Sequence, residues 1–200
     1  MGPMVVDQGR VRVVLVALVV ALAPALAACS DPEPDQPPPA EESVALRVET
    51  VRGAGKLPEQ DRTEIETAVG DVLSQYVVGA FLGDFPREEF VASFESFTSG
   101  VAGSAAEDID LLTAARVKDA ESVRATKLDA RLSFLVSDGD VVGATAAVDF
   151  GFEATMSEEE TRNLSLVGRF MLQEKNGTWS IFGYDVAHDD GAPLGSEESS

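Results

Sequence analysis

The chain has 200 residues, of which 44% are hydrophobic and 25% charged, and its formal net charge is -20. This length and composition predict one globular domain with tails, not a disordered chain. The acidic excess argues against nucleic-acid binding, which needs a basic surface to displace counterions from phosphates. A single cysteine and a single histidine exclude an internal disulfide and a cysteine-built zinc site, so we expect no metal or other cofactor.

The N-terminus has the parts of an export signal. Arg10 and Arg12 precede an unbroken apolar run at residues 13–28, which is 16 residues long and contains Pro24. A membrane-spanning helix needs about 20 residues, and proline disrupts the interior of a helix. Basic residues followed by a short apolar stretch and small residues therefore predict a signal peptide over residues 1–28.

The apolar run ends in Leu26-Ala27-Ala28-Cys29, which holds the only cysteine of the chain. This sequence resembles the lipobox of bacterial lipoproteins. The resemblance implies cleavage between Ala28 and Cys29, and a thioether-linked diacylglycerol that holds Cys29 at the extracytoplasmic face of the cell membrane. A thiolate is the best nucleophile available for that alkylation, and two or three acyl chains give stable anchoring. The alternatives are a secreted protein cut near Ala28 and an uncleaved anchor helix.

A tether is predicted between the lipid and the folded domain. Residues 30–42 are dominated by proline and acidic side chains, which both favour an extended chain. We therefore interpret residues 29–42 as the lipidated cysteine with a spacer, and residues 43–190 as the domain. A ligand for aromatic-lined grooves is the alternative for the proline-rich stretch. Residues 191–200 lack apolar periodicity, which is typical of a disordered tail.

The domain is expected to begin with a short strand and a long helix. Val44, Leu46 and Val48 alternate with polar residues, which predicts the strand. The helix is expected between Pro58 and Gly83, because proline suits a first helical turn and a wide apolar stripe follows at helical spacing. The members of the stripe are Ile65, Val69, Val72, Leu73, Tyr76, Val77, Ala80 and Phe81.

Two shorter helices are expected next. Pro86 can open the first, in which Phe90, Phe94 and Phe97 share one face at spacings of four and three. Such an aromatic stripe is typical of a core. Residues 104–107 have the S-x-x-E spacing of a capping box and predict the start of the other helix.

From Ser122 the apolar period changes from helical to alternating, which predicts four long strands. The turns between them are Asp138-Gly139, residues 157–160 and Asn176-Gly177. In the last strand Gly183 breaks the alternation and indicates a bulge. Helices followed by a meander predict an α+β fold, with the helices on one face of a curved four-stranded antiparallel sheet. The segment near Val44 adds one extra strand or none.

This order of elements resembles the nuclear-transport-factor-two-like (cystatin-like) cone, in which a curved antiparallel sheet wraps a long helix. The likeness spans roughly residues 58–186. Residues 83–90, 97–100 and 182–186 are also similar to uncharacterised actinobacterial lipoproteins, and eleven arginines against four lysines fit a high-G+C genome. The cone resemblance implies a pocket at its mouth, where isomerases and dehydratases carry acids, histidines or tyrosines.

The charged side chains of the predicted strands argue against catalysis. They fall on the register opposite to the apolar sets, and a general base must reach a substrate inside its site. We therefore expect a solvated sheet face and predict no catalytic residue. The charges in this register are Asp129, Arg131, Asp149, Glu153 and Arg169.

Three residues are candidates for lining a pocket. Tyr76 and Tyr184 would offer hydroxyl groups, although a buried tyrosine usually bonds only a backbone group. Asp185 is the one acid whose register is ambiguous. We expect Trp179 to pack with Tyr76 in one core, and His188 to be exposed beyond the last strand.

These patterns favour a lipid-anchored, noncatalytic module that binds an envelope protein or organises a complex outside the cytoplasm. The alternatives are a carrier of a small apolar ligand in the cone and, less favoured, an isomerase-type enzyme. An empty cavity of about 300 Å³ or more would favour the carrier, and a buried acid facing a tyrosine in it would favour the enzyme. The sequence names no partner, ligand or pathway. We expect residues 43–190 to fold as a monomer.

Overall fold

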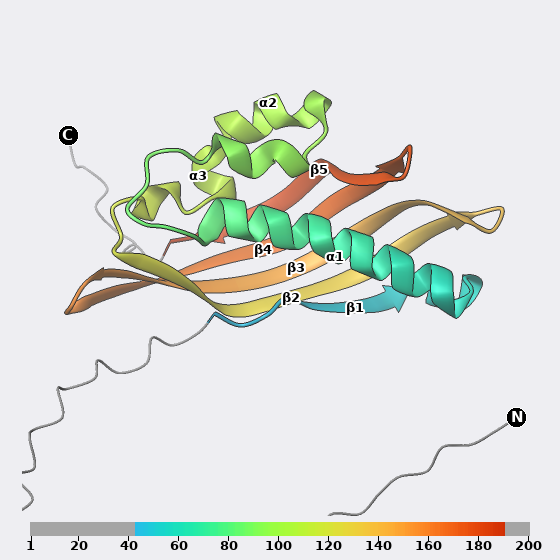
Figure 1. The fold of residues 1–200 in the computed structure, drawn as a ribbon, viewed down its shortest axis with the longest axis horizontal. Coiled ribbons are helices and arrows are strands. Elements are labelled where there is room, and N and C mark those ends of the chain that lie inside the picture. The colour runs from blue at the N-terminus through green and yellow to red at the C-terminus, as the bar shows by residue number, and fades with distance from the viewer. Residues whose placement is uncertain (1–42, 191–200) are drawn as a thin grey trace, which may run out of the picture. The chain divides into compact units, whose positions relative to one another are not determined.

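The computed structural model describes residues 43–190. The predicted signal peptide, Ala28, Cys29, the tether and the C-terminal tail lie outside these residues. Figure 1 shows a single sheet with a helical layer on one side. The strands are β1 Arg47–Arg52, β2 Ser122–Ser137, β3 Asp140–Ser157, β4 Glu160–Lys175 and β5 Thr178–Asp189. The helices are α1 Glu59–Phe81, α2 Ser99–Glu107 and α3 Ile109–Leu112, with short 3-10 helices η1 Ala54–Lys56, η2 Val91–Ser96 and η3 Ala115–Val117.

The sheet is mixed and has five strands, which corrects the expected four-stranded antiparallel sheet. Strands β2 to β5 form the predicted antiparallel meander, and β1 pairs with β2 in parallel, from Arg47 opposite Asp129 onward. All the helices lie between β1 and β2 in the chain. Such a long crossover returns the chain to the same end of the sheet, so β2 runs in the direction of β1.

Two turns of the meander have the geometry that their sequences predict. Asp138 and Gly139 have φ values of 56° and 96°, and Asn176 and Gly177 have φ values of 55° and 80°. Left-handed backbone at both central residues matches the twist of the flanking strands. The predicted bulge is confirmed beside Gly183, where the register of β4 and β5 shifts by one residue.

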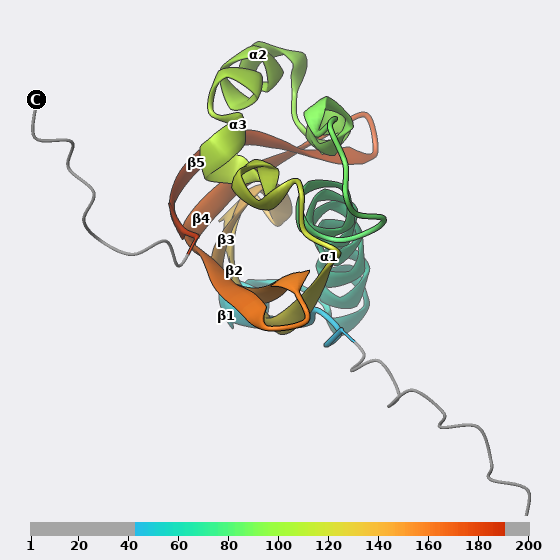
Figure 2. The ribbon, with the colours of Figure 1, turned by 90° about the vertical axis from the view of Figure 1, so that its left-hand side faces the viewer.

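Helix α1 crosses the concave side of the sheet, and Figure 2 shows it nearly end-on with the strands curving past it. Glu59 and Asp61 occupy its first turn, where the helix dipole favours acids. One face of α1 is buried, as its apolar stripe predicts. The buried residues are Val69, Val72, Leu73, Tyr76, Val77, Ala80 and Phe81. Among residues 43–190 no helix combines the length and the apolar character needed to cross a membrane.

The segment between α1 and β2 differs from its prediction. No α-helix starts at Pro86, and Phe90 and Phe97 flank the 3-10 helix η2, although both side chains are buried. Ser104 lies inside α2 and does not cap a helix. The Thr98 N–H donates to the Ile181 carbonyl, 2.8 Å away, so contact with β5 sets where α2 begins. The S-x-x-E spacing is a local pattern, so it could not predict this contact with a distant strand.

Candidate functional site

The space between α1 and the concave sheet face is filled by side chains. Tyr76 is fully buried there, and its hydroxyl donates to the Leu112 carbonyl, 2.5 Å away. The rings of Phe81, Phe97 and Phe170 pack against it with centroids 5.0–6.2 Å away. Burial raises the pKa of Tyr76 well above its ordinary value. Tyr76 is therefore a core residue with a satisfied hydroxyl and lines no open pocket. Trp179 is only partly buried, at the margin of the same core.

Tyr184 lies in the middle of β5 and joins this strand to the helical layer. Its hydroxyl donates to Asp108 Oδ2, 2.6 Å away, and its ring centroid is 6.2 Å from that of Phe97. Burial, followed by the bond to Asp108, raises the pKa of Tyr184 to about 12. Asp108 is an exposed acid, so this pair lacks the enclosed setting that an isomerase-type site would need.

Asp185 points to the convex face of the sheet, away from both tyrosines. In register it pairs with Arg169 of β4, and its Oδ2 lies 2.7 Å from Arg169 Nη2. The three candidate residues therefore do not share a pocket. Phe97 packs between Tyr76 and Tyr184, while Asp185 belongs to the opposite face.

His188 is not an exposed tail residue, because β5 extends through it. It continues the inward register of Tyr184 and pairs with the buried Leu166 of β4. Its Nδ1–H donates to the Asp110 carbonyl, 3.0 Å away, and its ring lies 5.8 Å from that of Phe81. Nε2 is buried and has no hydrogen-bond partner among residues 43–190. Burial lowers the pKa of His188.

A groove of about 500 Å³ opens on the outer side of the helical layer, between α1 and η2. Val78 and Gly79 of α1 form one wall, and Ala92 and Glu95 of η2 belong to the other. Val78 is 55% exposed. Val78 lies outside the apolar stripe that predicts the buried face of α1. An apolar residue outside that stripe is the signal in the sequence that could have indicated the groove.

The groove has a narrow floor because α1 and η2 approach closely at Gly79. A Cβ at Gly79 would lie 3.2 Å from Ser93 Cα, and Ser93 Oγ donates to the Gly79 carbonyl, 2.7 Å away. Arg87 donates to the same carbonyl and to that of Leu82, and its guanidinium lies 4.1 Å from the centroid of the Phe90 ring. Its partial burial lowers the pKa of Arg87. This arginine therefore fastens the C-terminal end of α1 to the segment that leads into η2.

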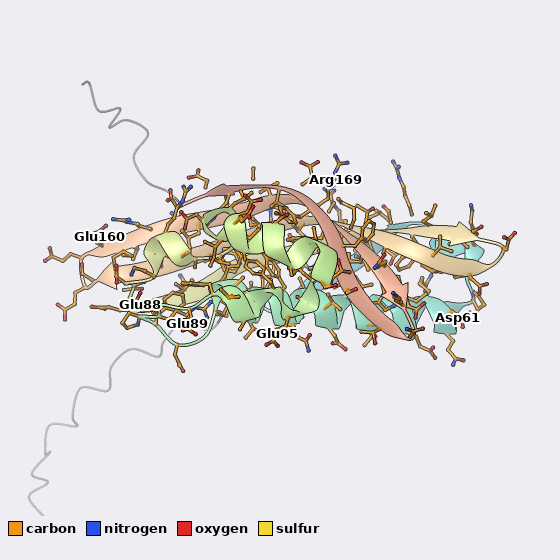
Figure 3. The ribbon with its side chains drawn as sticks, turned by 90° about the horizontal axis from the view of Figure 1, so that it is seen from above. Asp61, Glu88, Glu89, Glu95, Glu160 and Arg169 are labelled. Carbon is orange, nitrogen blue, oxygen red and sulfur yellow. The ribbon has the colours of Figure 1, made fainter. Side chains whose placement is uncertain are left out.

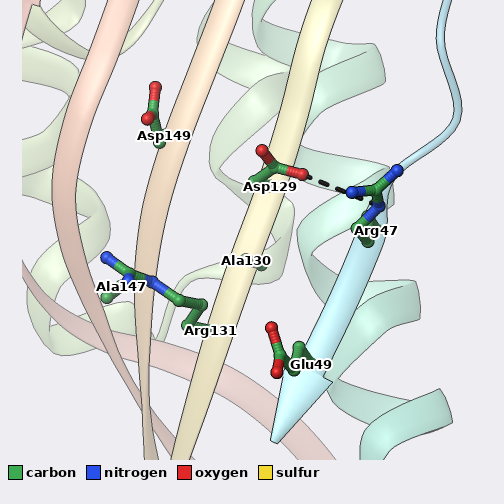
Figure 4. Close-up of a pocket in the computed structure, with 7 residues that line it drawn as sticks. All are labelled: Arg47, Glu49, Asp129, Ala130, Arg131, Ala147 and Asp149. Carbon is green, nitrogen blue, oxygen red and sulfur yellow. Dashed lines mark ion pairs between the residues drawn. The ribbon is translucent and has the colours of Figure 1, made fainter. Parts of the chain in front are cut away.

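A second hollow, of about 270 Å³, lies on the convex face over β1, β2 and β3. Figure 4 shows that charged side chains surround it. Arg47 Nε lies 4.0 Å from Asp129 Oδ1, and Lys127 pairs with Asp149. These pairs join neighbouring strands, and they confirm the predicted solvated face.

Arg131 differs from the other basic residues of the convex hollow. Its guanidinium extends over Ala147 (Figure 4), and among residues 43–190 it makes no ion pair. Gly168 deepens the neighbouring surface, because a side chain there would collide with β5: its Cβ would lie 2.6 Å from Val186 Cα. Of the basic residues that line this hollow within residues 43–190, Arg131 is therefore the one without an ion pair, and it lies above small residues.

Comparison with family models, curated proteins and solved structures found no match. Within residues 43–190, no group of three or more histidine, cysteine, aspartate or glutamate side chains is arranged to hold a metal ion. The functional argument therefore rests on the geometry of the groove and of the convex face.

Proposed function

We propose that the protein is a lipid-anchored module of the cell envelope that binds another protein without catalysing a reaction. The lipid on Cys29 would hold it at the extracytoplasmic face of the cell membrane. The resemblance of Leu26-Ala27-Ala28-Cys29 to a lipobox supports the anchor. The acidic, proline-rich residues 30–42 would keep the domain away from the lipid surface.

The packing of the concave side carries the binding part of this proposal. Ligand sites of small molecules are usually concave cavities, but here aromatic side chains occupy the interior. The largest of the fully buried side chains are Tyr76, Phe81, Phe150, Phe152 and Phe170. Hollows that are open to the surface lie between α1 and η2, between α1 and β1, and on the convex face. Outer surfaces suit contacts with another protein better than they suit a carrier or an isomerase-type site.

We also propose that the domain is a variant of the cystatin-like cone. The β2–β5 meander curving past α1 supports this assignment (Figure 2). Strand β1, parallel at the edge of β2, would be an addition to that cone. The likeness to actinobacterial lipoproteins in residues 83–90, 97–100 and 182–186 belongs to the same proposal.

Membrane fractionation of a Cys29→Ser variant tests the anchor. We expect the wild-type chain in the membrane fraction, cut before Cys29 and heavier by the diacylglyceryl group in intact-mass spectra. The variant should lack the lipid and should not be cut at that position. A variant that stays membrane-bound and is cut at the same place would contradict the proposed anchor.

Cross-linking in intact cells tests the binding part. With the anchor present, we expect the cross-links to one envelope protein to map to one face of the domain. Organic extraction of the purified protein tests the alternative, a carrier of a small apolar ligand. Recovery of a small apolar molecule in equimolar amount, without mapped protein cross-links, would support the carrier instead.

A further inference from the structure

On the α1 side the groove is lined by Ser74, Gln75, Val78 and Gly79, and Val78 is the one large apolar side chain among them. Val78 is 55% exposed inside the groove, and Val91, at the start of η2, is 62% exposed. Ala92 faces the groove from the η2 side. Apolar side chains gathered at a concave surface are typical of an interaction site.

Carboxylates without partners flank this apolar surface. Glu95 lines the groove. Asp71 lies on α1 about two turns before Val78 and lines the neighbouring hollow between α1 and β1, which shares Ser74 with the groove. Figure 3 shows Glu89 and Glu95 on the same long side of the domain, opposite Arg169. Among residues 43–190, these three acids make no ion pair. Arg87 donates to the carbonyls of Gly79 and Leu82 and forms no ion pair with a carboxylate among residues 43–190, so it does not neutralise Glu95 by direct contact.

We infer that this groove binds a basic segment of a partner protein, which places an aliphatic side chain between Val78 and Ala92. Lysine or arginine side chains of the segment lie against Glu95 and Asp71. This inference rests on the proposed binding function and adds the chemistry of the partner. A membrane surface is the less suitable occupant, because anionic headgroups and the flanking carboxylates repel one another.

The test uses the full chain, with its anchor, in phosphatidylcholine nanodiscs. Two dye-labelled peptides of equal length serve as probes, one of leucine and lysine and the other of leucine and glutamate. Fluorescence anisotropy measures the Kd of each at low and high salt. We expect the lysine peptide to bind, salt to weaken its binding, and the glutamate peptide not to bind.

Matched variants separate groove binding from general attraction to an acidic protein. Val78→Lys should raise the Kd of the lysine peptide at least about tenfold, because it removes the apolar contact and adds a repelling charge. Val142 is 52% exposed and far from the groove in the chain, on β3, so Val142→Lys should change the Kd less than about twofold. Asp71→Asn with Glu95→Gln should raise it about threefold and reduce its salt dependence. Urea unfolding verifies that each variant is folded.

Equal losses in Val78→Lys and Val142→Lys would overturn the inference, and so would equal binding of the two peptides. Phosphatidylglycerol vesicles provide the membrane alternative. One further result would overturn the inference in favour of a membrane surface. In that result the wild-type chain binds these vesicles, Val78→Ser abolishes the binding, and the lysine peptide does not bind. The fractionation of Cys29→Ser does not depend on the groove, so failure of the anchor and failure of this inference are distinguishable.

Discussion

The helical side and the convex side of the domain carry charge in different ways. On the convex face, opposite charges lie across neighbouring strands and neutralise each other, as in Arg169 with Asp185 and Lys127 with Asp149. On the helical side, Glu95 in the groove and Asp71 in the adjoining hollow beside β1 have no such partner among residues 43–190. The strand register brings charges of opposite sign together on the sheet. A helix beside a 3-10 segment has no such register, so the groove keeps charge that can attract a partner.

On the convex side, the close pairing of the strands leaves little space for an added side chain. Gly168→Ala tests this and has the largest expected effect. Gly168 has a φ of 148°, and an added Cβ would collide with the β5 backbone at Asp185 and Val186. We expect a loss of about 3 kcal/mol in the free energy of unfolding, measured in urea.

Gly103→Ala is the control for that substitution. Gly103 lies in α2, and a Cβ there meets nothing within 4 Å. The change should stabilise the domain by about 0.5–1 kcal/mol, because alanine loses less backbone entropy in a helix. Similar effects of the two substitutions would show that the convex strands can shift to admit a side chain.

Tyr76→Phe tests how tightly the opposite side is packed. Removal of the hydroxyl leaves the buried Leu112 carbonyl without its donor, which should cost about 1–2 kcal/mol of unfolding free energy. Tyr184→Phe is the matched control, because its hydroxyl bonds the exposed Asp108. It should cost less than about 1 kcal/mol. A larger loss in Tyr184→Phe than in Tyr76→Phe would contradict the assignment of Tyr76 to the dry core.

The helical side should also be the more sensitive to mild acid. His188 is the only histidine, and burial lowers its pKa below the ordinary 6.5, with Arg116, Asp110, Asp189 and Asp190 nearby. The unfolded chain therefore binds the proton at higher pH than the folded chain does. The stabilising contribution is complete above about pH 6.5 and falls as the pH drops through the folded pKa.

Urea unfolding at about pH 7.5 and about pH 5.5 measures this contribution. The wild-type domain should be less stable at the lower pH. His188→Gln should show a smaller difference, because glutamine does not titrate. An unchanged pH dependence in the variant would assign the effect to carboxylates instead.

The smallest expected effects concern two exposed side chains, Val78 in the groove and Arg131 on the convex face. Val78→Ser and Arg131→Ala should each change the free energy of unfolding by less than about 0.5 kcal/mol, since both residues are exposed and Arg131 makes no ion pair among residues 43–190. A loss above about 1 kcal/mol in Val78→Ser would mean that this valine supports the fold.

The sequence predicts those parts of the domain that depend on local pattern. The meander is predicted by the alternation after Ser122 and by the Asn176-Gly177 turn. The buried face of α1 is predicted by the apolar stripe through Tyr76. The direction of β1 depends on a long crossover, and the start of α2 depends on contact with β5. Neither leaves a local signal in the chain.

The candidate sites show the same limit. Tyr76, Tyr184 and Asp185 have the chemistry of pocket residues, but the strand register and the packing of Phe97 send them to different places. In the sequence, His188 is a polar residue close to the predicted tail. In the structure, the alternation of β5 extends to His188, so its side chain points inward beside Leu166. The groove depends on how η2 packs against α1, which no spacing within either segment specifies.

The parallel pairing of β1 also sets an order of folding. Strands β2 to β5 meet their neighbours through short turns, whereas Ser43 Oγ accepts a hydrogen bond from the Ala125 N–H, 82 residues later in the chain. Closing so long a loop costs more chain entropy than closing a turn. We therefore expect the meander to form first and β1 to pair with β2 afterwards. Before β1 pairs, its segment carries the charged side chains of Arg47, Glu49 and Arg52. Charged side chains on an unpaired strand disfavour its pairing with other chains.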